Sequence, residues 1–278
     1  MFLVTGANGQ LGNELKLILQ GNAVYVDRDE LDITDQAAVN EFVKSRSFEA
    51  IINCAAFTAV DKAEAEQELA EKINVEGPRN LAMTGIPLIQ VSTDYVFDGT
   101  GCRPYVETDE PHPESVYGVT KLAGEKAVLE NASTAVIIRT AWLYSTFGNN
   151  FVKTMRKLGA ERQSLNVVFD QVGTPTYAKD LAQAIVDILP QIKPGMKEVY
   201  HFSNEGVCSW YDFATAIMAQ SDLNCEVFPI ESKDYPTPAK RPAYSVLNKG
   251  KIKRDFNLKI NHWAVSLAEC VEKINNGF

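Results

Sequence analysis

The sequence predicts an α/β protein with a Rossmann-like, doubly wound parallel sheet and a smaller, mainly C-terminal substrate-binding lobe. Three observations carry this prediction. At 278 residues, the chain is about twice as long as a typical single domain. Short apolar runs alternate with helix-length amphipathic segments, as in βαβ units. A glycine-rich turn over residues 6–12 joins the first apolar run to the first helical segment.

The order of the elements follows from this alternation, because each apolar run predicts a strand and each amphipathic segment predicts a helix. The expected strands cover residues 1–5, 23–27, 50–54, 86–92, 134–139, 166–169 and 198–203. The expected helices cover residues 12–19, 37–44, 63–83, 116–130, 151–159 and 178–189.

The second lobe is indicated by a change of composition over residues 231–254. Three prolines, Pro236, Pro238 and Pro242, stand there among crowded basic residues. We expect a dinucleotide-binding domain over residues 1–143, to which residues 168–204 return. Residues 144–167 and 205–278 are expected to form the substrate-binding lobe.

The composition excludes several classes of protein and partner. With 45% hydrophobic and 23% charged residues, the chain resembles an average folded protein. Its net charge of −9 disfavours binding to nucleic acid or anionic lipid, since both are polyanions. The five cysteines form no C-x-x-C pair, and no apolar stretch approaches the ~20 residues of a membrane span. We therefore expect a cytoplasmic protein with no membrane partner, and, with only three scattered histidines, no zinc site.

The glycine-rich turn has the features of a cofactor site. Backbone N–H groups and the positive end of the following helix can hold a pyrophosphate, and glycine permits its close approach. The candidate cofactor residues in this turn are Gly6, Asn8, Gly9, Gln10, Leu11 and Gly12. The second strand ends about 20 residues after Gly6, at Asp27 and Arg28. An acid there suits the ribose 2′-hydroxyl of NAD and an arginine suits the 2′-phosphate of NADP, so the choice between NADH and NADPH stays open.

A catalytic group is predicted on the helix over residues 116–130. Tyr117 and Lys121 are four residues apart and share one face of that helix. The ammonium of Lys121 can favour phenolate character in Tyr117, whose unperturbed pKa of ~10 makes it a poor proton donor and acceptor near neutrality. Ser92, Thr93 and Asp94 end the fourth strand, where Thr93 can supply a second hydroxyl.

These motifs resemble the extended short-chain dehydrogenase/reductase family, and within it the dTDP-4-dehydrorhamnose reductases. The resemblance runs in order along the chain, through the glycine turn, residues 55–64, 92–99, 117–125, 139–142, 148–151, 170–176 and 236–242. It implies the last step of dTDP-L-rhamnose synthesis, in which NADPH or NADH reduces the C4 ketone of dTDP-4-dehydro-L-rhamnose. The implied partner is thus a dTDP-linked 4-keto-6-deoxy sugar.

The resemblance also implies the role of each residue. Tyr117 gives a proton to the developing alkoxide, Thr93 hydrogen-bonds the ketone oxygen, and Lys121 holds the cofactor ribose. Such hydroxyl groups can stabilise and then protonate an oxyanion. The resemblance further implies cofactor contacts at Gln10, Leu11, Asp27, Asp32, Ile33, Ala55, Ala56 and Thr58, and sugar contacts at Asp94 and Trp142. We add Arg28 as a candidate cofactor residue and Tyr95 as a candidate substrate residue.

Charge adds one expectation about the substrate. Residues 233–254 contain seven basic residues and one acid in an otherwise acidic chain. Such a stripe suits a diphosphate held between the lobes, and Arg241, framed by prolines, is the best candidate for a bidentate contact.

A metal site and the oligomeric state stay open. Some family members are described as magnesium-linked dimers held by carboxylates. Glu14 matches one such position, but Glu269, Glu272 and Lys273 compete for the C-terminal one. We expect a monomer or a homodimer, with Mg²⁺ as an option through Glu14.

Three other functions are compatible with the same fold. A related protein is a non-catalytic regulatory subunit of methionine adenosyltransferase, but intact Thr93, Tyr117 and Lys121 argue against that role. Reductases of stereoisomeric dTDP-4-keto sugars share these motifs. An epimerase would not consume reduced cofactor, and a dehydratase commonly has a second acid where this chain has Tyr95.

Overall fold

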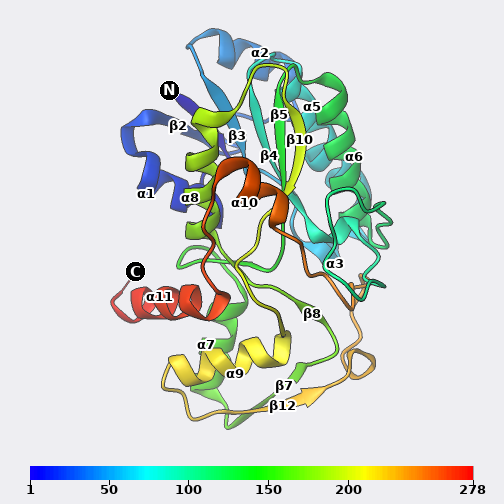
Figure 1. The fold of residues 1–278 in the computed structure, drawn as a ribbon, viewed down its shortest axis with the longest axis vertical. Coiled ribbons are helices and arrows are strands. Elements are labelled where there is room, and N and C mark those ends of the chain that lie inside the picture. The colour runs from blue at the N-terminus through cyan, green and yellow to red at the C-terminus, as the bar shows by residue number, and fades with distance from the viewer. Residues whose placement is uncertain (278) are drawn as a thin grey trace.

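The computed structural model describes residues 1–277 and has a six-stranded parallel sheet at its centre (Figure 1). The strands are β1 (Phe2–Thr5), β2 (Ala23–Val26), β3 (Ala50–Asn53), β4 (Leu88–Thr93), β5 (Ala135–Thr140) and β10 (Lys197–His201). Their order in the sheet is β10-β5-β4-β3-β1-β2, and each neighbouring pair is parallel. The order reverses between β1 and β3, and open α/β sheets bind ligands at such a switch point.

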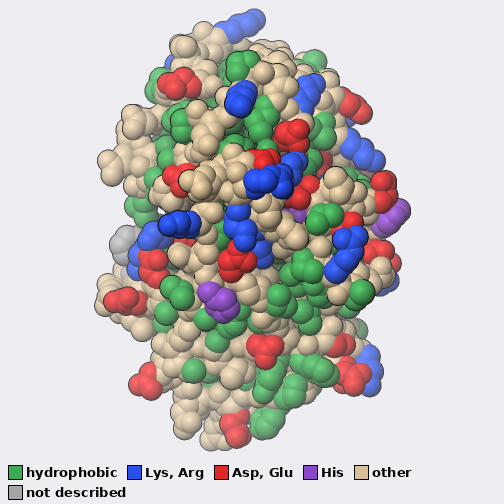
Figure 2. All heavy atoms as spheres, viewed as in Figure 1, with side chains coloured by type: hydrophobic (Ala, Val, Ile, Leu, Met, Phe, Trp, Pro, Cys, Tyr) green, Lys and Arg blue, Asp and Glu red, His purple; other side chains and the backbone are tan. Residues whose placement is uncertain are grey.

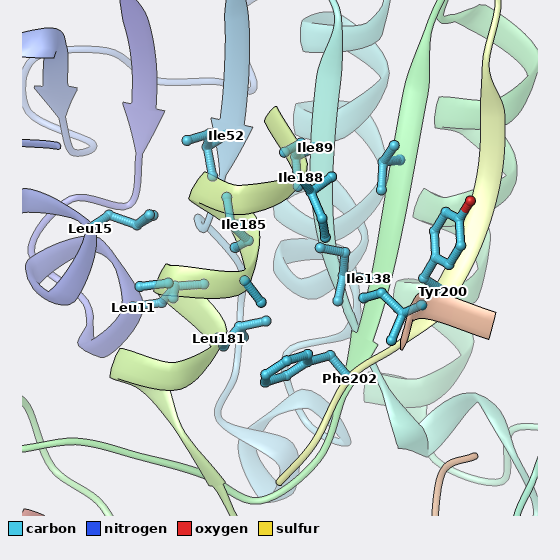
Figure 3. Packing of buried hydrophobic residues seen from close by; sticks show 14 of the residues in the cluster. Leu11, Leu15, Ile52, Ile89, Ile138, Leu181, Ile185, Ile188, Tyr200 and Phe202 are labelled. Atoms are coloured by element: carbon cyan, nitrogen blue, oxygen red, sulfur yellow. The ribbon is translucent and has the colours of Figure 1, made fainter. Parts of the chain in front are cut away.

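Consecutive strand residues point to opposite faces of the sheet, and each face has its own buried cluster. Val4, Ile52 and Ile138 pack against one set of helices, and their neighbours Leu3, Ile51 and Ile137 pack against another. The first set is α1 (Gln10–Leu19), α8 (Ala178–Ile188) and α10 (Gly250–Phe256), and the second is α2 (Gln36–Lys44), α5 (Gly77–Ala82) and α6 (Val116–Asn131). Figure 3 shows side chains of α1 and α8 against the first face. The predicted doubly wound fold is confirmed.

The prediction of one continuous helix over residues 63–83 is wrong. The segment consists of α3 (Val60–Ala63), α4 (Gln67–Glu71), a π-helical turn (Lys72–Glu76) and α5. Pro78 has no N–H to donate to the carbonyl of Asn74, four residues earlier, so the α-helical ladder is interrupted there. Helix α6 lies so close that a Cβ on Gly124 would come within 2.0 Å of that carbonyl oxygen.

A third buried cluster lies away from the central sheet. It contains residues of α7 (Phe151–Glu161), β7 (Ser164–Val168), α9 (Trp210–Gln220) and α11 (Trp263–Asn275). Strand β7 was predicted, but it pairs with β12 (Glu226–Ile230), which was not. Two further short pairs join β6 (Leu143–Tyr144) to β9 (Thr176–Tyr177) and β8 (Val172–Gly173) to β11 (Cys208–Ser209).

The expected division into lobes needs one change near its C-terminal end. Ile252 and Phe256 of α10 belong to the buried cluster of the central sheet, where Phe256 packs against Tyr200 with ring centroids 4.9 Å apart. Residues 250–256 were expected in the substrate-binding lobe, but burial of these two apolar side chains places them on the sheet. The other boundaries stay predictions. No helix among residues 1–277 is long and apolar enough to cross a membrane.

His201 on β10 makes the stability of the fold depend on pH. Its side chain is fully buried, and its Nδ1 lies 3.1 Å from the carbonyl oxygen of Tyr105. Burial, helped by the Arg139 guanidinium, lowers the pKa of His201 from 6.5 to about 3. The unfolded chain therefore binds the extra proton between these pH values, and this group alone lowers stability by up to about 1.4 kcal/mol per pH unit on acidification.

We expect His201→Asn, which keeps a neutral donor, to be less stable than the wild type near neutral pH by an amount that shrinks as the pH falls toward 4. Urea unfolding of both proteins at a series of pH values measures this difference. A difference that stays constant between about pH 7 and about pH 4 would show that His201 does not titrate on unfolding.

Candidate active site

A cavity of about 760 Å³ opens at the carboxyl ends of β1, β3, β4 and β5. It brings together nearly all the predicted site residues. Its lining includes Gly6, Gly9, Gln10, Leu11, Gly12, Asp27, Arg28, Asp32, Ile33, Ala55, Ala56, Thr58, Thr93, Asp94, Tyr95, Tyr117, Lys121 and Trp142. Asn8, Arg241 and the possible metal ligand Glu14 are the predicted residues that do not line it.

The glycine turn at one end of the cavity requires its glycines for steric reasons. Gly6 has φ of +65°, and a Cβ there would lie 2.6 Å from the backbone nitrogen of Ala55. A Cβ on Gly12 would lie 2.5 Å from the carbonyl oxygen of Gly6. The turn therefore stays close to β3 and opens directly into α1, whose N-terminal N–H groups suit a phosphate.

Asp27 connects this turn to the end of β2. Its carboxylate accepts the backbone N–H of Asn8 at 2.9 Å and that of Arg28 at 2.8 Å. The backbone N–H of Asn8 therefore ties the glycine turn to the end of β2. Arg28 and the unpredicted Lys72 line the same end of the cavity, and both favour the ionised form of Asp32, whose pKa is lowered chiefly by its hydrogen bond with Thr34.

Thr93, Tyr117 and Lys121 meet in the middle of the cavity. Thr93 Oγ1 donates to the Asp94 carboxylate at 3.0 Å, and Lys121 Nζ donates to the carbonyl oxygen of Val91 at 2.8 Å. The ring of Tyr95 meets that of Tyr117 edge to face, with centroids 5.5 Å apart. The fixed end of β4 and the first turns of α6 therefore place two hydroxyls and one ammonium at the same site.

Burial dominates the electrostatics of this group. It raises the pKa of Tyr117 above the usual 10, an effect that a hydrogen bond with Thr93 opposes and the Asp94 carboxylate increases. It also lowers the pKa of Lys121 to about 8 and raises that of Asp94 to about 6. The expectation that Lys121 eases the ionisation of Tyr117 is not met in this arrangement, since the ammonium of Lys121 donates to Val91 instead.

Trp142 forms the wall of the cavity nearest the second lobe. Its backbone has φ of +48°, a left-handed conformation that is strained for a large residue. Its indole stacks on Trp210, with ring centroids 3.6 Å apart. A Cβ on Gly173 would lie 2.7 Å from the same indole, so the orientation of Trp142 is fixed by its neighbours.

Arg241 lies behind the cavity wall. Its guanidinium pairs with Asp61 at 2.8 Å and donates to the hydroxyl of Tyr95 at 3.3 Å, and Tyr95 in turn lines the cavity. Asp61 also accepts the backbone N–H of Ala239. This contact holds the proline-framed loop of the C-terminal segment against α3.

The expected free basic stripe over residues 233–254 is not present, because each of its seven cations forms an ion pair. The pairs are Lys233–Glu231, Lys240–Glu114, Arg241–Asp61, Lys249–Glu205, Lys251–Glu198, Lys253–Glu205 and Arg254–Asp255. Figure 2 shows basic and acidic side chains intermingled on the face that carries α10. The segment that looks basic in sequence is paired with acids, most of them from elsewhere in the chain.

Glu14 lies outside any cluster of metal-binding side chains among the described residues. Glu14 is buried and accepts a hydrogen bond from Ser145 at 2.6 Å. Burial raises its pKa, and the ammonium groups of Lys273 and Lys179 act on it. Among residues 1–277, no group of three or more His, Cys, Asp or Glu side chains is placed to hold a metal ion.

Several residues of the site were not predicted. Cys54, Leu69, Lys72 and Ile73 line the cavity, and Glu125 and Arg139 form a buried ion pair beside it. Glu125 could have been noticed, since it follows Lys121 by the same four residues that separate Lys121 from Tyr117. Arg139 carries no such signal, because its partner lies on another element.

Comparison with known proteins gives consistent matches over the whole chain. A family model described as the RmlD substrate binding domain matches residues 1–276. A dTDP-4-dehydrorhamnose reductase of Aggregatibacter actinomycetemcomitans is 43% identical and covers 95% of this chain and 96% of that protein. A solved dTDP-4-dehydrorhamnose reductase from Clostridium acetobutylicum has a TM-score of 0.94 at 43% identity, with 99% of both chains covered. One from Bacillus anthracis, described in complex with NADP, has a TM-score of 0.94 at 38% identity, with 98% of both chains covered.

Proposed function

The chain belongs to the RmlD substrate binding domain family, and from this premise we infer that it reduces the C4 ketone of dTDP-4-dehydro-L-rhamnose to give dTDP-L-rhamnose, using NADPH. The observation that carries this function is the cavity itself. Thr93, Tyr117 and Lys121 lie in the same cavity as the glycine turn, so a bound dinucleotide and a ketone can meet there.

We propose that the catalytic work is divided among three side chains. The nicotinamide, when bound, supplies the hydride that goes to C4. Tyr117 donates its phenolic proton to the resulting alkoxide oxygen, and Thr93 donates a hydrogen bond to that oxygen as its charge develops. Lys121 holds the cofactor ribose with its ammonium. Because Tyr117 is neutral at physiological pH, it is in the form that a proton donor needs.

The sugar and its diphosphate are assigned to the other end of the cavity. We propose that Asp94, Tyr95 and Trp142 contact the sugar, since they line the cavity beside Thr93. Asp94 is buried and lines the cavity beside Thr93, so its carboxylate is placed to accept a hydrogen bond from a sugar hydroxyl. We propose that Arg241 holds Tyr95 in place at the end of the cavity that takes the diphosphate, since its guanidinium donates to the Tyr95 hydroxyl. We also propose a cytoplasmic location, since five free cysteines suit a reducing compartment.

The consumption of reduced cofactor separates this function from its alternatives. We expect the purified protein to oxidise one NADPH for each dTDP-L-rhamnose formed from dTDP-4-dehydro-L-rhamnose. An epimerase would convert the sugar without net loss of NADPH absorbance, and a regulatory subunit would bind the cofactor without turnover. A reductase of another stereoisomer would give a product of equal mass but with the opposite configuration at C4, which NMR detects.

We propose a preference for NADPH that depends on Arg28, because its guanidinium lines the cavity beside Asp27. We expect Arg28→Ala to lower kcat/KM for NADPH by about 10-fold and to leave kcat/KM for NADH within about twofold of the wild type, since only NADPH carries the 2′-phosphate. Arg46→Ala, which removes an arginine outside the cavity, is the control. Equal losses with both cofactors in Arg28→Ala would contradict this role.

A further inference from the structure

A buried cluster of polar side chains lies next to Lys121. Glu125 follows Lys121 by one turn of α6, and its side chain is 3% exposed, while that of Arg139 is 5% exposed. Arg139 donates to both carboxylate oxygens of Glu125, from Nε at 2.9 Å and from Nη2 at 2.7 Å. Ser92 Oγ donates to the same carboxylate. The Glu125 side chain is therefore held from two sides.

The cluster joins the three elements that carry the catalytic group. Ser92 and Arg139 face each other in the register of β4 and β5, and the next pair in that register is Thr93 and Thr140. Glu125 connects both strand ends to α6. The positions of Thr93 on β4 and of Lys121 on α6 are thus fixed relative to each other by one carboxylate.

Stability alone does not account for such a cluster. Removing two charges from water costs free energy that their attraction only partly returns, so a buried ion pair is often no more stabilising than apolar residues of the same volume. A bidentate pair does fix geometry, because guanidinium and carboxylate are planar and meet in one orientation. The placement beside Lys121 therefore points to a role in the site.

The charge on Lys121 depends on its surroundings. Its ammonium is buried, and its hydrogen bond goes to the uncharged carbonyl of Val91. Burial lowers the pKa of Lys121 to about 8, and Glu125 is the carboxylate that opposes this effect, with a smaller contribution from Cys54. The titratable and charged groups that share the cavity or the cluster with Lys121 are Asp27, Arg28, Asp32, Cys54, Lys72, Asp94, Tyr95, Tyr117, Glu125 and Arg139.

We propose that Glu125 is a positioning residue of the active site. Arg139 and Ser92 hold its carboxylate in place one helical turn from Lys121, and this carboxylate keeps Lys121 charged for the cofactor. The inference rests on the proposed function, in which Lys121 binds the ribose.

The test compares Glu125→Gln, Glu125→Asp and the wild type. Glutamine keeps an acceptor for Arg139 and Ser92 but removes the charge, and aspartate keeps the charge. Glu130→Gln, at an exposed position of the same helix, is the matched control. We expect the alkaline decline of kcat/KM for NADPH to move down by about 1 pH unit in Glu125→Gln. In Glu125→Asp and Glu130→Gln, the alkaline decline should stay near its wild-type pH. In all three variants, KM for the sugar should change less than about twofold.

A second readout does not need turnover. Acetic anhydride labels the neutral form of Lys121, and mass spectrometry measures the rate at each pH. The labelling curve should move to lower pH in Glu125→Gln. Unmoved labelling and activity curves in a folded Glu125→Gln protein would overturn the inference. If Glu125→Gln does not fold, Glu125→Asp carries the test, because aspartate keeps the charge. A labelling curve of Glu125→Asp that lies about 1 pH unit below that of the wild type would then overturn the inference. A wild type without turnover but with the expected Glu125 dependence of labelling would refute the proposed function and leave standing only the effect of Glu125 on the charge of Lys121.

Discussion

Replacing Tyr117 with phenylalanine should lower kcat by about 10²- to 10⁴-fold, the usual contribution of a positioned proton donor. The substitution removes one oxygen and keeps the ring that meets Tyr95 edge to face. The alkoxide formed at C4 would then have to take its proton from water. Steady-state kinetics with NADPH and dTDP-4-dehydro-L-rhamnose measure the loss.

Cofactor binding should survive this change, because Lys121 and the glycine turn are untouched. Fluorescence titration with NADPH measures Kd, which we expect within about threefold of the wild type. Tyr235→Phe removes the hydroxyl of an exposed tyrosine and is the control for the loss of a phenolic hydroxyl outside the cavity. A Tyr117→Phe enzyme with kcat within about threefold of the wild type would remove Tyr117 from the mechanism.

The second large effect concerns stability. We expect Arg139→Met to lower the free energy of unfolding by about 3–5 kcal/mol, because it leaves the buried Glu125 carboxylate without its countercharge. Urea unfolding, followed by circular dichroism, measures the loss.

The double variant Glu125→Leu/Arg139→Met should recover most of this loss, since apolar residues of similar volume can replace a buried pair. Its alkaline decline of kcat/KM for NADPH should lie at lower pH than in the wild type, because Lys121 has lost the carboxylate beside it. A double variant no more stable than Arg139→Met would mean that the cluster is needed for folding. A double variant with wild-type kcat/KM would mean that the carboxylate has no role in the site.

The features that could be predicted from sequence are those encoded by neighbouring residues. Consecutive apolar residues of a strand, such as Leu3 and Val4, point to opposite faces of the sheet, and both faces are therefore buried. The glycine turn is local as well, since Gly6 needs its positive φ within a single βα connection. Tyr117 and Lys121 share a helix face through their spacing alone. The family resemblance added the substrate contacts at the strand ends.

The features that could not be predicted depend on partners far away in the chain. The cations of residues 233–254 look free in sequence, but Arg241 meets Asp61 and Lys240 meets Glu114 only after folding. The ion pair of Glu125 and Arg139 likewise requires α6 to lie against the end of β5. The π-helical turn within residues 63–83 stands just before Pro78, and the close approach of α6 to this turn needs Gly124.

Transfer of a hydride from NADPH to C4 of a dTDP-linked 4-keto sugar in this cavity can be followed with an isotope. The most direct measurement uses NADPH carrying deuterium at the transferred position of its nicotinamide C4, with NMR and mass analysis of the sugar product. We expect dTDP-L-rhamnose with one deuterium, bound at sugar C4, and about 10²- to 10⁴-fold less of this product from Tyr117→Phe in the same time. Product without deuterium, or deuterium at another carbon, would contradict it.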